Sequence, residues 1–397
     1  MSEQKTYWRW LPDWGSGMSE TISYLTDRQA TDTGNEYRSR LREHPRRSIG
    51  FASLVDRHHF RDLDAALHGA EAGEWVVPVW WLRDTSLGFD EVGGVYEYEV
   101  DDPDDWVGVD YVLVWSRDAW HGSTLTTPGL DGIRLEEEPP EHLQRAGVRL
   151  YPAHPAAIES DLTREAITAA VATCQAEASF LGHRVHSSYE PELEYGDLPV
   201  FDIRPNRVSP LEAQYVRLTE TIDFELGVRA FYDDADFPHT AHQREYLLDE
   251  DQTEELVELF HHVGGSAGRF WTPTANADLE VVGVDVDEVT IRTLGWEQHY
   301  DGAPTRQHLY FRLRDGGPVL REIDSASVDG DEETLTLADP VDFDAGDIRQ
   351  VCWLELSRFG SDTLTIDRIT PALSEVTLTL VTLRDDDIDP DPVPSPE

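Results

Sequence analysis

The stretch MSETISYLTD (residues 18–27) has a close match in LTETIDFELG (residues 218–227). Both contain Glu-Thr-Ile followed by a polar residue and an aromatic one, at Glu20–Tyr24 and Glu220–Phe224. The two Glu residues are 200 positions apart (220 − 20). A match at a long, fixed offset indicates an internal repeat, so further landmarks are expected in the same order.

A helix-like segment follows in each half, at residues 56–73 and 249–268. Apolar residues recur at helical spacing in both segments. They are Leu63, Ala66 and Leu67 in the first and Leu256, Leu259, Phe260 and Val263 in the second. We expect Asp251 or Thr253 to cap the second helix and Gly264-Gly265 to end it.

Each helix leads through Ala-Gly into an aromatic stretch with a proline, AGEWVVPVWW from Ala72 and AGRFWTPTAN from Ala267. The two prolines are 195 positions apart (273 − 78), and a later pair of Ala-Gly dipeptides is 199 apart (346 − 147). Landmarks that keep their order at nearly one offset predict a duplicated chain.

The repeat also decides between helix and strand for ITAAVATCQAEASF (residues 167–180), whose alanines favour a helix. Its counterpart, EVTLTLVTL (residues 375–383), alternates apolar and polar residues as a strand does. We therefore predict strands in both places. Further strands are expected in GVYEYEV from Gly94, VGVDYVLVW from Val107, VDEVTIRTL from Val286, RQHLYFRL from Arg306 and ETLTLA from Glu333.

The predicted fold is mainly β with one helix per repeat, arranged as two β-sandwich or half-barrel domains. The first domain spans residues 1–182, a joint spans 183–203, and the second domain spans 204–385. Residues 386–397 form an acidic, proline-rich tail that we expect to be disordered.

The composition indicates a protein adapted to very high salt. The 397 residues include 79 Asp+Glu against 32 Lys+Arg, a formal net charge of −47, and Lys5 is the only lysine. At about 1 M salt the Debye length is about 3 Å, so like charges on a surface hardly repel one another. With 12 Trp, 14 Tyr and 13 Phe the chain has too many large apolar groups for a disordered acidic protein. We interpret it as a protein of a haloarchaeal cytoplasm or of a virus that grows there.

The charge argues against specific nucleic-acid binding, although it suits a surface that DNA must pass without sticking. The first residues contain no apolar run, and no window approaches 18 apolar residues, so neither a signal peptide nor a membrane span is expected. Two cysteines, Cys174 and Cys352, do not make a disulfide scaffold in a chain of this size.

No nucleotide-binding, hydrolase or zinc-binding motif is present, so we expect no enzyme activity, no cofactor and no metal. Neighbouring histidines, His58-His59 and His261-His262, point about 100° apart on a helix and are read as surface residues. The acidic clusters at residues 101–106 and 327–335 could hold a hard cation but lack a calcium-loop spacing, and solvated turns are the simpler interpretation.

One cluster stands out: five arginines between Tyr37 and Arg47, in YRSRLREHPRR. Three of them alternate and would share one face of a strand. The cluster comprises Arg38, Arg40, Arg42, Arg46 and Arg47. Arginine makes bidentate pairs with carboxylates, so the cluster predicts a docking surface for an acidic neighbour; ion pairs within the sheet are the equal alternative.

These residues also carry a resemblance. The run from Asp27 to Trp81 resembles the conserved core of the distal tail proteins of long-tailed phages and gene transfer agents. The matching positions are Gly34, Glu36, Arg38, Arg46, Arg47, Phe51, the helix around Leu63 to Leu67, and Trp75 to Trp81. Residues 220–271 resemble it more weakly: Arg244 and Tyr246 stand where the arginine-rich strand belongs, and the second arginine cluster is absent.

The resemblance implies a tail-tube-like β-sandwich that assembles as a ring between the tail tube and the tail tip. The usual member has one such domain, whereas this chain is expected to have two. It therefore implies a structural virion protein of the tail tip or baseplate of a haloarchaeal siphovirus, made in the host cytoplasm.

The implied partners are further copies of the chain, the tail tube protein, and the hub and tape-measure proteins. A closed ring of three copies with pseudo-sixfold symmetry is favoured, with a hexamer as the alternative. Two other functions stay open: the tail hub itself, and a carbohydrate-binding or hydrolytic β-sandwich protein of a halophile.

Overall fold

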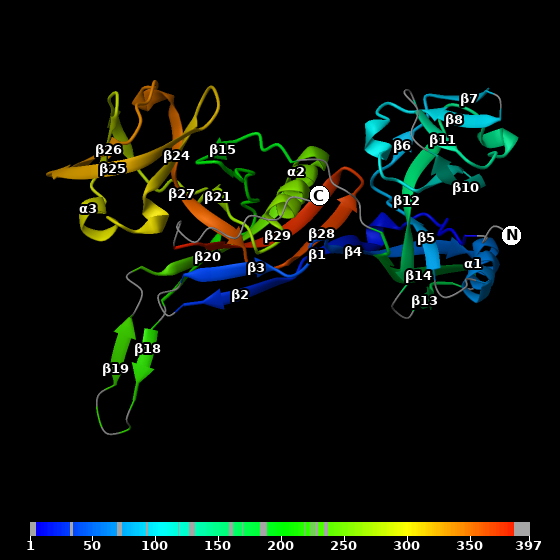
Figure 1. Ribbon diagram of the computed structural model, residues 1–397, viewed down its shortest axis with the longest axis horizontal. Coiled ribbons are helices and arrows are strands. Elements are labelled where there is room, and N and C mark those ends of the chain that lie inside the picture. Colours follow the sequence, from blue (N-terminus) through cyan, green and yellow to red (C-terminus); the bar gives the residue numbers. More distant parts are fainter. Residues whose placement is uncertain are drawn as a thin grey trace.

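The computed structural model is built around a large antiparallel sheet (Figure 1). It describes residues 5–31, 35–69, 74–92, 94–117, 119–126, 132–158, 162–168, 170–182, 189–217, 219–223, 225, 227, 229–233 and 237–384. The predicted tail at 386–397, Gly34, and residues 183–188 of the predicted joint lie outside these ranges. The rest of the joint packs against the second half, where Val200 pairs with Trp271.

The first half contains one helix, α1 (Arg57–Gly69). Its strands are β1 (Met18–Ser23), β2 (Thr26–Ala30), β3 (Glu36–Arg40), β4 (Arg46–Asp56), β5 (Glu74–Pro78), β6 (Asp84–Thr85), β7 (Gly88–Val92), β8 (Val95–Glu99), β9 (Tyr111–Ser116), β10 (Ala119–Thr126), β11 (Gly132–Leu135), β12 (Arg149–Ile158), β13 (Thr163–Ala166) and β14 (Val171–Phe180).

The second half contains α2 (Glu250–Val263) and a short helix, α3 (Trp296–His299). Its strands are β15 (Glu194–Tyr195), β16 (Leu198–Pro199), β17 (Glu212–Val216), β18 (Thr219–Ile222), β19 (Ala230–Asp233), β20 (His239–Leu248), β21 (Phe270–Pro273), β22 (Val281–Val284), β23 (Glu288–Arg292), β24 (His308–Leu313), β25 (Val319–Asp329), β26 (Glu332–Leu337), β27 (Ile348–Phe359), β28 (Thr363–Thr370) and β29 (Leu373–Thr382).

The same pairing pattern occurs in both halves. A strand and a hairpin lead into a long strand and a helix: β1, β2–β3, β4 and α1 in the first half, and β17, β18–β19, β20 and α2 in the second. The long strand pairs with the first strand on one side and with the last strand of its half on the other. In each half a small β-module, β6–β11 or β22–β26, is inserted before the last three strands (Figure 1).

The two halves share one continuous sheet of eight strands. Its order is β13–β14–β4–β1–β28–β29–β20–β17, antiparallel throughout. Helices α1 and α2 lie on the same face, because Leu63 packs with Phe51 and Val55 of β4, and Phe260 packs with Leu248 of β20. The modules have cores of their own, around Tyr98 and Trp106 in the first half and around Trp296 in the second, where Trp353 of β27 joins the core.

The predicted strands and helices are confirmed in kind. Residues 171–180 form β14, a strand despite their alanines, and the five further strand segments overlap β8, β9, β23, β24 and β26. The predicted cap of α2 is wrong: Asp249 is the cap, and its carboxylate accepts a hydrogen bond from Gln252 N at 3.0 Å. Gly264 ends the helix as expected, in the left-handed conformation.

One landmark of the repeat was wrongly matched. Glu20–Ile22 lies in β1, between β4 and β28, whereas Glu220–Ile222 lies in β18, whose one partner strand among the described residues is β19. A motif of only three residues can occur in many strands, so its sequence does not determine which strands lie beside it. The proline landmark occupies matching places, since Pro78 of β5 pairs with β12 and Pro273 of β21 pairs with β27.

Candidate assembly surfaces

The junction between the halves is a strand pair, β1 with β28, in the middle of the sheet (Figure 1). Glu20 of β1 is enclosed there between two guanidinium groups, from Arg47 and Arg368, each 2.7 Å from one of its carboxylate oxygens. The Arg368 guanidinium also lies over the ring of Trp81, 4.6 Å from its centre. A buried carboxylate with two cations and an aromatic cover fixes which strands meet at the junction.

The β2–β3 hairpin fastens the first half to the second. Glu36 of β3 makes a bidentate pair with Arg358 of β27, with both N–O distances 2.6 Å. At the hairpin base, the Asp362 carboxylate accepts hydrogen bonds from the backbone and hydroxyl of Thr26, and the Tyr24 hydroxyl lies 2.8 Å from His261 Nδ1. The hairpin therefore clasps the C-terminal end of α2 and the β27–β28 turn.

A cleft of about 370 Å³ lies beside this junction, between α2 and the turn at residues 104–108. Glu20, Arg47 and Arg368 line it, and its rim carries Asp104 and Glu250 among other acids. The cleft therefore belongs to the contact between the halves.

The structure places the predicted arginine cluster at this same junction. Arg38 is buried, with a guanidinium nitrogen 3.5 Å from Gly268 O, and Arg40 stacks on the ring of Tyr24. Arg42 donates to Ser23 O at 3.0 Å but lies beyond the end of β3, because the chain bends before Pro45, so it does not share the predicted strand face. Arg46 is exposed, and Arg47 pairs with Glu20 as the alternative of an internal ion pair expects. Docking to another protein stays a prediction.

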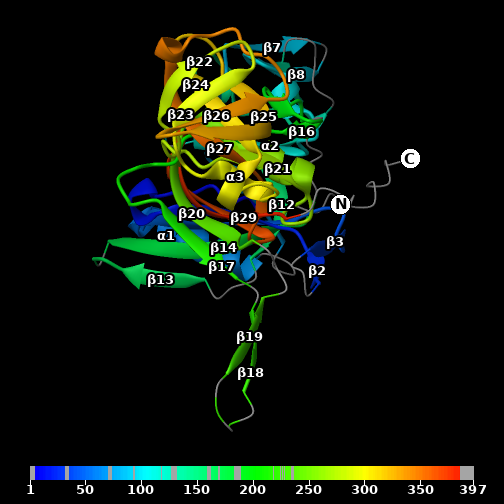
Figure 2. The same cartoon turned by 90° about the vertical axis from the view of Figure 1, so that its left-hand side faces the viewer.

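The outer strands of the sheet each have one unpaired edge among the described residues: β13 pairs only with β14, and β17 only with β20. Every residue of both strands is exposed, including Tyr215 at 63%. The β18–β19 hairpin projects away from the body of the molecule (Figure 2) and exposes Phe231 at 68%. Open edges with exposed apolar groups pair readily with another chain.

The face of the sheet opposite the helices is polar. Because strand residues alternate between faces, it carries the neighbours of the buried positions, among which Ser, Thr and Gln are the commonest kinds. Leu54 and Leu247 also lie on this face and are exposed. The charged side chains along its eight strands are acidic apart from Arg46, which lies at the start of β4. They include Glu165, Glu177, Glu212, Glu245, Asp367 and Glu375.

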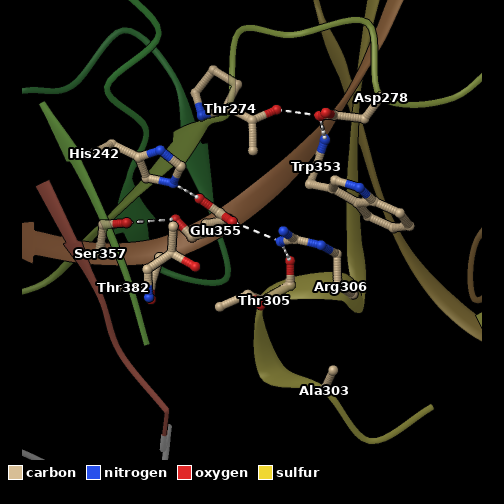
Figure 3. A network of polar contacts seen from close by, with 12 residues as sticks. His242, Thr274, Asp278, Ala303, Thr305, Arg306, Trp353, Glu355, Ser357 and Thr382 are labelled. Atoms are coloured by element: carbon tan, nitrogen blue, oxygen red, sulfur yellow. Dashed lines mark hydrogen bonds and ion pairs between the residues drawn. The ribbon is translucent and has the colours of Figure 1, made fainter. Parts of the chain in front are cut away.

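A second buried ionic network lies within the second half (Figure 3). The Glu355 carboxylate of β27 accepts hydrogen bonds from His242 Nε2 at 2.7 Å and from Arg306 at 2.6 Å. Nearby, Asp278 accepts from Trp353 N and from the Thr274 hydroxyl. These contacts tie the inserted module to the central sheet.

The histidines and cysteines noted in the sequence lie apart from one another in the structure. His59 pairs with Asp56 on the surface of α1, and His262 stacks against Tyr189. Cys174 and Cys352 are free and buried, and burial raises the pKa of the Cys174 thiol to about 11. Over the described ranges, no group of three or more His, Cys, Asp or Glu is arranged to hold a metal. No described helix is long and apolar enough to cross a membrane.

The features that the sequence did not reveal are the junction pair of Glu20 with Arg368 and the two open edges. The stretch EAQYV at 212–216, with an apolar pair beside polar residues, is a strand signal that could have indicated β17. The Glu-Thr-Ile motif that follows it was matched to β1 instead. The chain matches no protein-family model, and a search of curated proteins finds no match.

Proposed function

We propose that this chain is a structural protein of a viral tail tip, a distal tail or baseplate ring protein of a haloarchaeal tailed virus. In this proposal it arose by duplication of one tail-tube-like domain, and copies of it close into a ring that joins the tail tube to the hub. The ring leaves a central channel through which DNA passes.

The observation that carries the proposal is the eight-stranded sheet with an open strand at each end. One end is β17, a first strand of the repeated pairing pattern, and the other is β13, a second-to-last strand. Inside the chain those two kinds of strand already pair, as β1 with β28. The two open edges of one chain are therefore of the two kinds that can pair with each other, so copies can join head to tail. Head-to-tail contacts that close by rotation form rings.

The polar face of the sheet supports a channel for DNA. Short hydroxyl side chains and carboxylates make up much of it, beside a few apolar residues such as Leu54 and Leu247, and among the charged residues along its strands only Arg46 is basic. An acidic wall repels the phosphate backbone, so DNA would slide past it without being held. The net charge of −47 supports the same conclusion and agrees with a high-salt environment.

The tail hub is a second candidate in the same particle. Because each chain has two similar halves, three copies would present six similar domains. Six domains match a sixfold tube on one side, and three chains match a threefold hub on the other. Position along the tail separates the two candidates, since a distal tail ring contacts the tube directly.

Labelling virions with an antibody against the purified chain tests the proposal. We expect label at the tail tip only, and cryo-electron microscopy of that tip should show this chain around the channel. Its absence from virions, or a glycan hydrolase activity lost on changing one defined carboxylate pair, would reject the proposal.

A further inference from the structure

We propose that the contact between copies repeats the contact between the halves, so that β17 of one copy pairs antiparallel with β13 of the next, Gln214 opposite Thr163. The partner is a second copy of this chain. The inference rests on the ring of the proposed function and adds to it the strands, their register and the covering hairpin.

The correspondence between β1 and β17 follows from the helix caps. Asp56 ends β4 and accepts from His59 N, and Asp249 follows β20 and accepts from Gln252 N, three residues on in each case. The offset is therefore 193 (249 − 56). Glu20 pairs with Ile49, and Ala213 pairs with His242, the residue at the same offset from Ile49. Residues 18–69 thus match 211–262 without an insertion.

The correspondence between β13 and β28 follows from their neighbours in the same way. Cys174 pairs with Ser53, and Val376 pairs with Tyr246, which stands 193 positions after Ser53. The offset here is 202 (376 − 174). On β13, Arg164 pairs with Cys174, so it corresponds to Ile366, which pairs with Val376.

With these two offsets, each residue pair between β1 and β28 gives an equivalent residue pair between β17 of one copy and β13 of the next. Thr21 lies opposite Thr365, and their counterparts are Gln214 and Thr163. By the same conversion the pair Glu20–Ile366 becomes Ala213–Arg164, and Ile22–Leu364 becomes Tyr215–Leu162. The last of these pairs determines how much apolar surface the contact between copies would bury.

Ile22 and Leu364 are almost completely buried at the junction, with 1% and 2% of their surfaces exposed. Tyr215, in the corresponding place, is 63% exposed in the single chain. Pairing β17 with β13 would cover it against Leu162, on the face that carries the helices. Burial of an aromatic side chain is favourable, and it therefore favours a covered edge over an open one.

The β18–β19 hairpin fits the same contact. Thr26 pairs with Arg40 in the first hairpin, and Thr219 pairs with Asp233 in the second, again at an offset of 193. The first hairpin lies on the end of α2, but the second projects free of its own chain (Figure 1). In the ring it would lie on the end of α1 of the next copy, where His68 occupies the place of His261.

The charges of the two contacts differ. Residues 26–43 contain four acids and four arginines, whereas residues 219–236 contain six acids and one arginine. The helices change in the opposite sense over their whole length, since α1 has two arginines and two aspartates whereas α2 has five acids and no arginine. Arg57 and Arg61 lie in the first turns of α1, away from the end at His68. An acidic hairpin therefore meets the less acidic helix. This complementarity selects the second half of one copy for the first half of another.

Paired cysteines test the register. Thr163→Cys with Gln214→Cys should form disulfides between copies under mild oxidation in about 3 M salt, because directly opposed strand residues lie within disulfide reach. Thr21→Cys with Thr365→Cys is the matched control and should close within one chain. Ile167→Cys with Gln214→Cys is four residues out of register, about 13 Å, and should not close. The native thiols are buried and do not compete.

Non-reducing electrophoresis should show covalent dimers and trimers for the first pair and only monomers for the other two. The inference is overturned if the control closes within the chain while Thr163→Cys with Gln214→Cys stays monomeric, or if the out-of-register pair cross-links instead. A chain found at the virion tip without this cross-link would leave the proposed function standing. Cross-linked rings of a chain absent from virions would reject the function and keep the interface.

Discussion

Glu20 on β1 and Arg368 on β28 form an ion pair of 2.7 Å across the strand pair that joins the halves of the sheet. Their side chains are only 2% and 7% exposed, and Arg47 contacts the other oxygen of the same carboxylate. One carboxylate thus balances two guanidinium groups, and the contact between the halves depends on its charge.

Replacing Glu20 by Gln should strongly destabilise the chain. The substitution leaves Arg47 and Arg368 buried without a counter-charge, and breaking a buried pair in this way costs about 3–5 kcal/mol. Chemical unfolding in high salt measures the loss. Glu177→Gln, on the exposed polar face, is the control and should change the free energy of unfolding by less than about 0.5 kcal/mol. Equal effects of the two substitutions would contradict the role of Glu20.

The same carboxylate should make stability depend on pH. Burial alone would raise the pKa of Glu20, but Arg47 and Arg368 hold it below its usual value of 4.5. A group whose pKa is lower in the folded state contributes its full stability above the unfolded pKa and loses it as the pH falls through the folded pKa. The thermal midpoint should therefore be steady from pH 7 to about pH 5 and fall below it, and Glu20→Gln should flatten this fall.

Glu355→Gln should weaken the second half separately. Burial would raise the pKa of Glu355, yet His242 and Arg306 hold it low, so the group is a carboxylate at neutral pH (Figure 3). We expect a loss of about 3–5 kcal/mol, because the Arg306 guanidinium is left without its counter-charge. Limited proteolysis should cut the second half first in this variant, whereas exposed Glu332→Gln should be cut like the native chain. Earlier cutting of the first half would contradict the assignment.

The sequence predicted local structure well because the signals are local. The alternation in residues 375–383 and the apolar spacing of α2 mark a strand and a helix without knowledge of their neighbours. The cap at Asp249 was missed because Asp251 and Thr253, close by, are equally good cap residues. The placement of Glu220–Ile222 failed for the same reason, since a three-residue motif does not specify the partner of the strand in which it lies.

The junction could not be predicted in this way. Residues 20 and 368 are far apart in sequence, and in a chain with 79 acids any single carboxylate is an unremarkable candidate for an arginine partner. Likewise the arginine cluster was recognised, but its contacts with Gly268 and Tyr24 follow from the fold of the hairpin over α2. Long-range pairing, and with it the open edges of the sheet, comes from the three-dimensional structure.

Lowering the salt should unfold or dissociate the protein. The net charge of −47 is spread over a surface with few cations, and the Debye length grows from about 3 Å at 1 M to about 10 Å at 0.1 M, so repulsion between carboxylates increases. We expect loss of the β-sheet circular dichroism signal, of the oligomer, or of both, below about 1 M salt. An unchanged spectrum and particle size after dialysis to about 0.1 M would contradict high-salt adaptation.

The last prediction is that the ring contains three copies. With the contact between copies equivalent to the contact within a chain, each step around the axis turns by the same angle, and six similar units close a ring at three chains. The two kinds of contact differ in charge, so they alternate and the true symmetry is threefold. The eight strands per chain would then join into one closed sheet without open edges, with the acidic face turned to the channel. Cryo-electron microscopy of the tail tip decides between three and six copies. Six copies around the axis, or a channel lined by Arg38, Arg40 and Arg42, would refute this arrangement. In the single chain these arginines are engaged elsewhere: Arg38 contacts Gly268 of the second half, and Arg40 and Arg42 contact Tyr24 and Ser23.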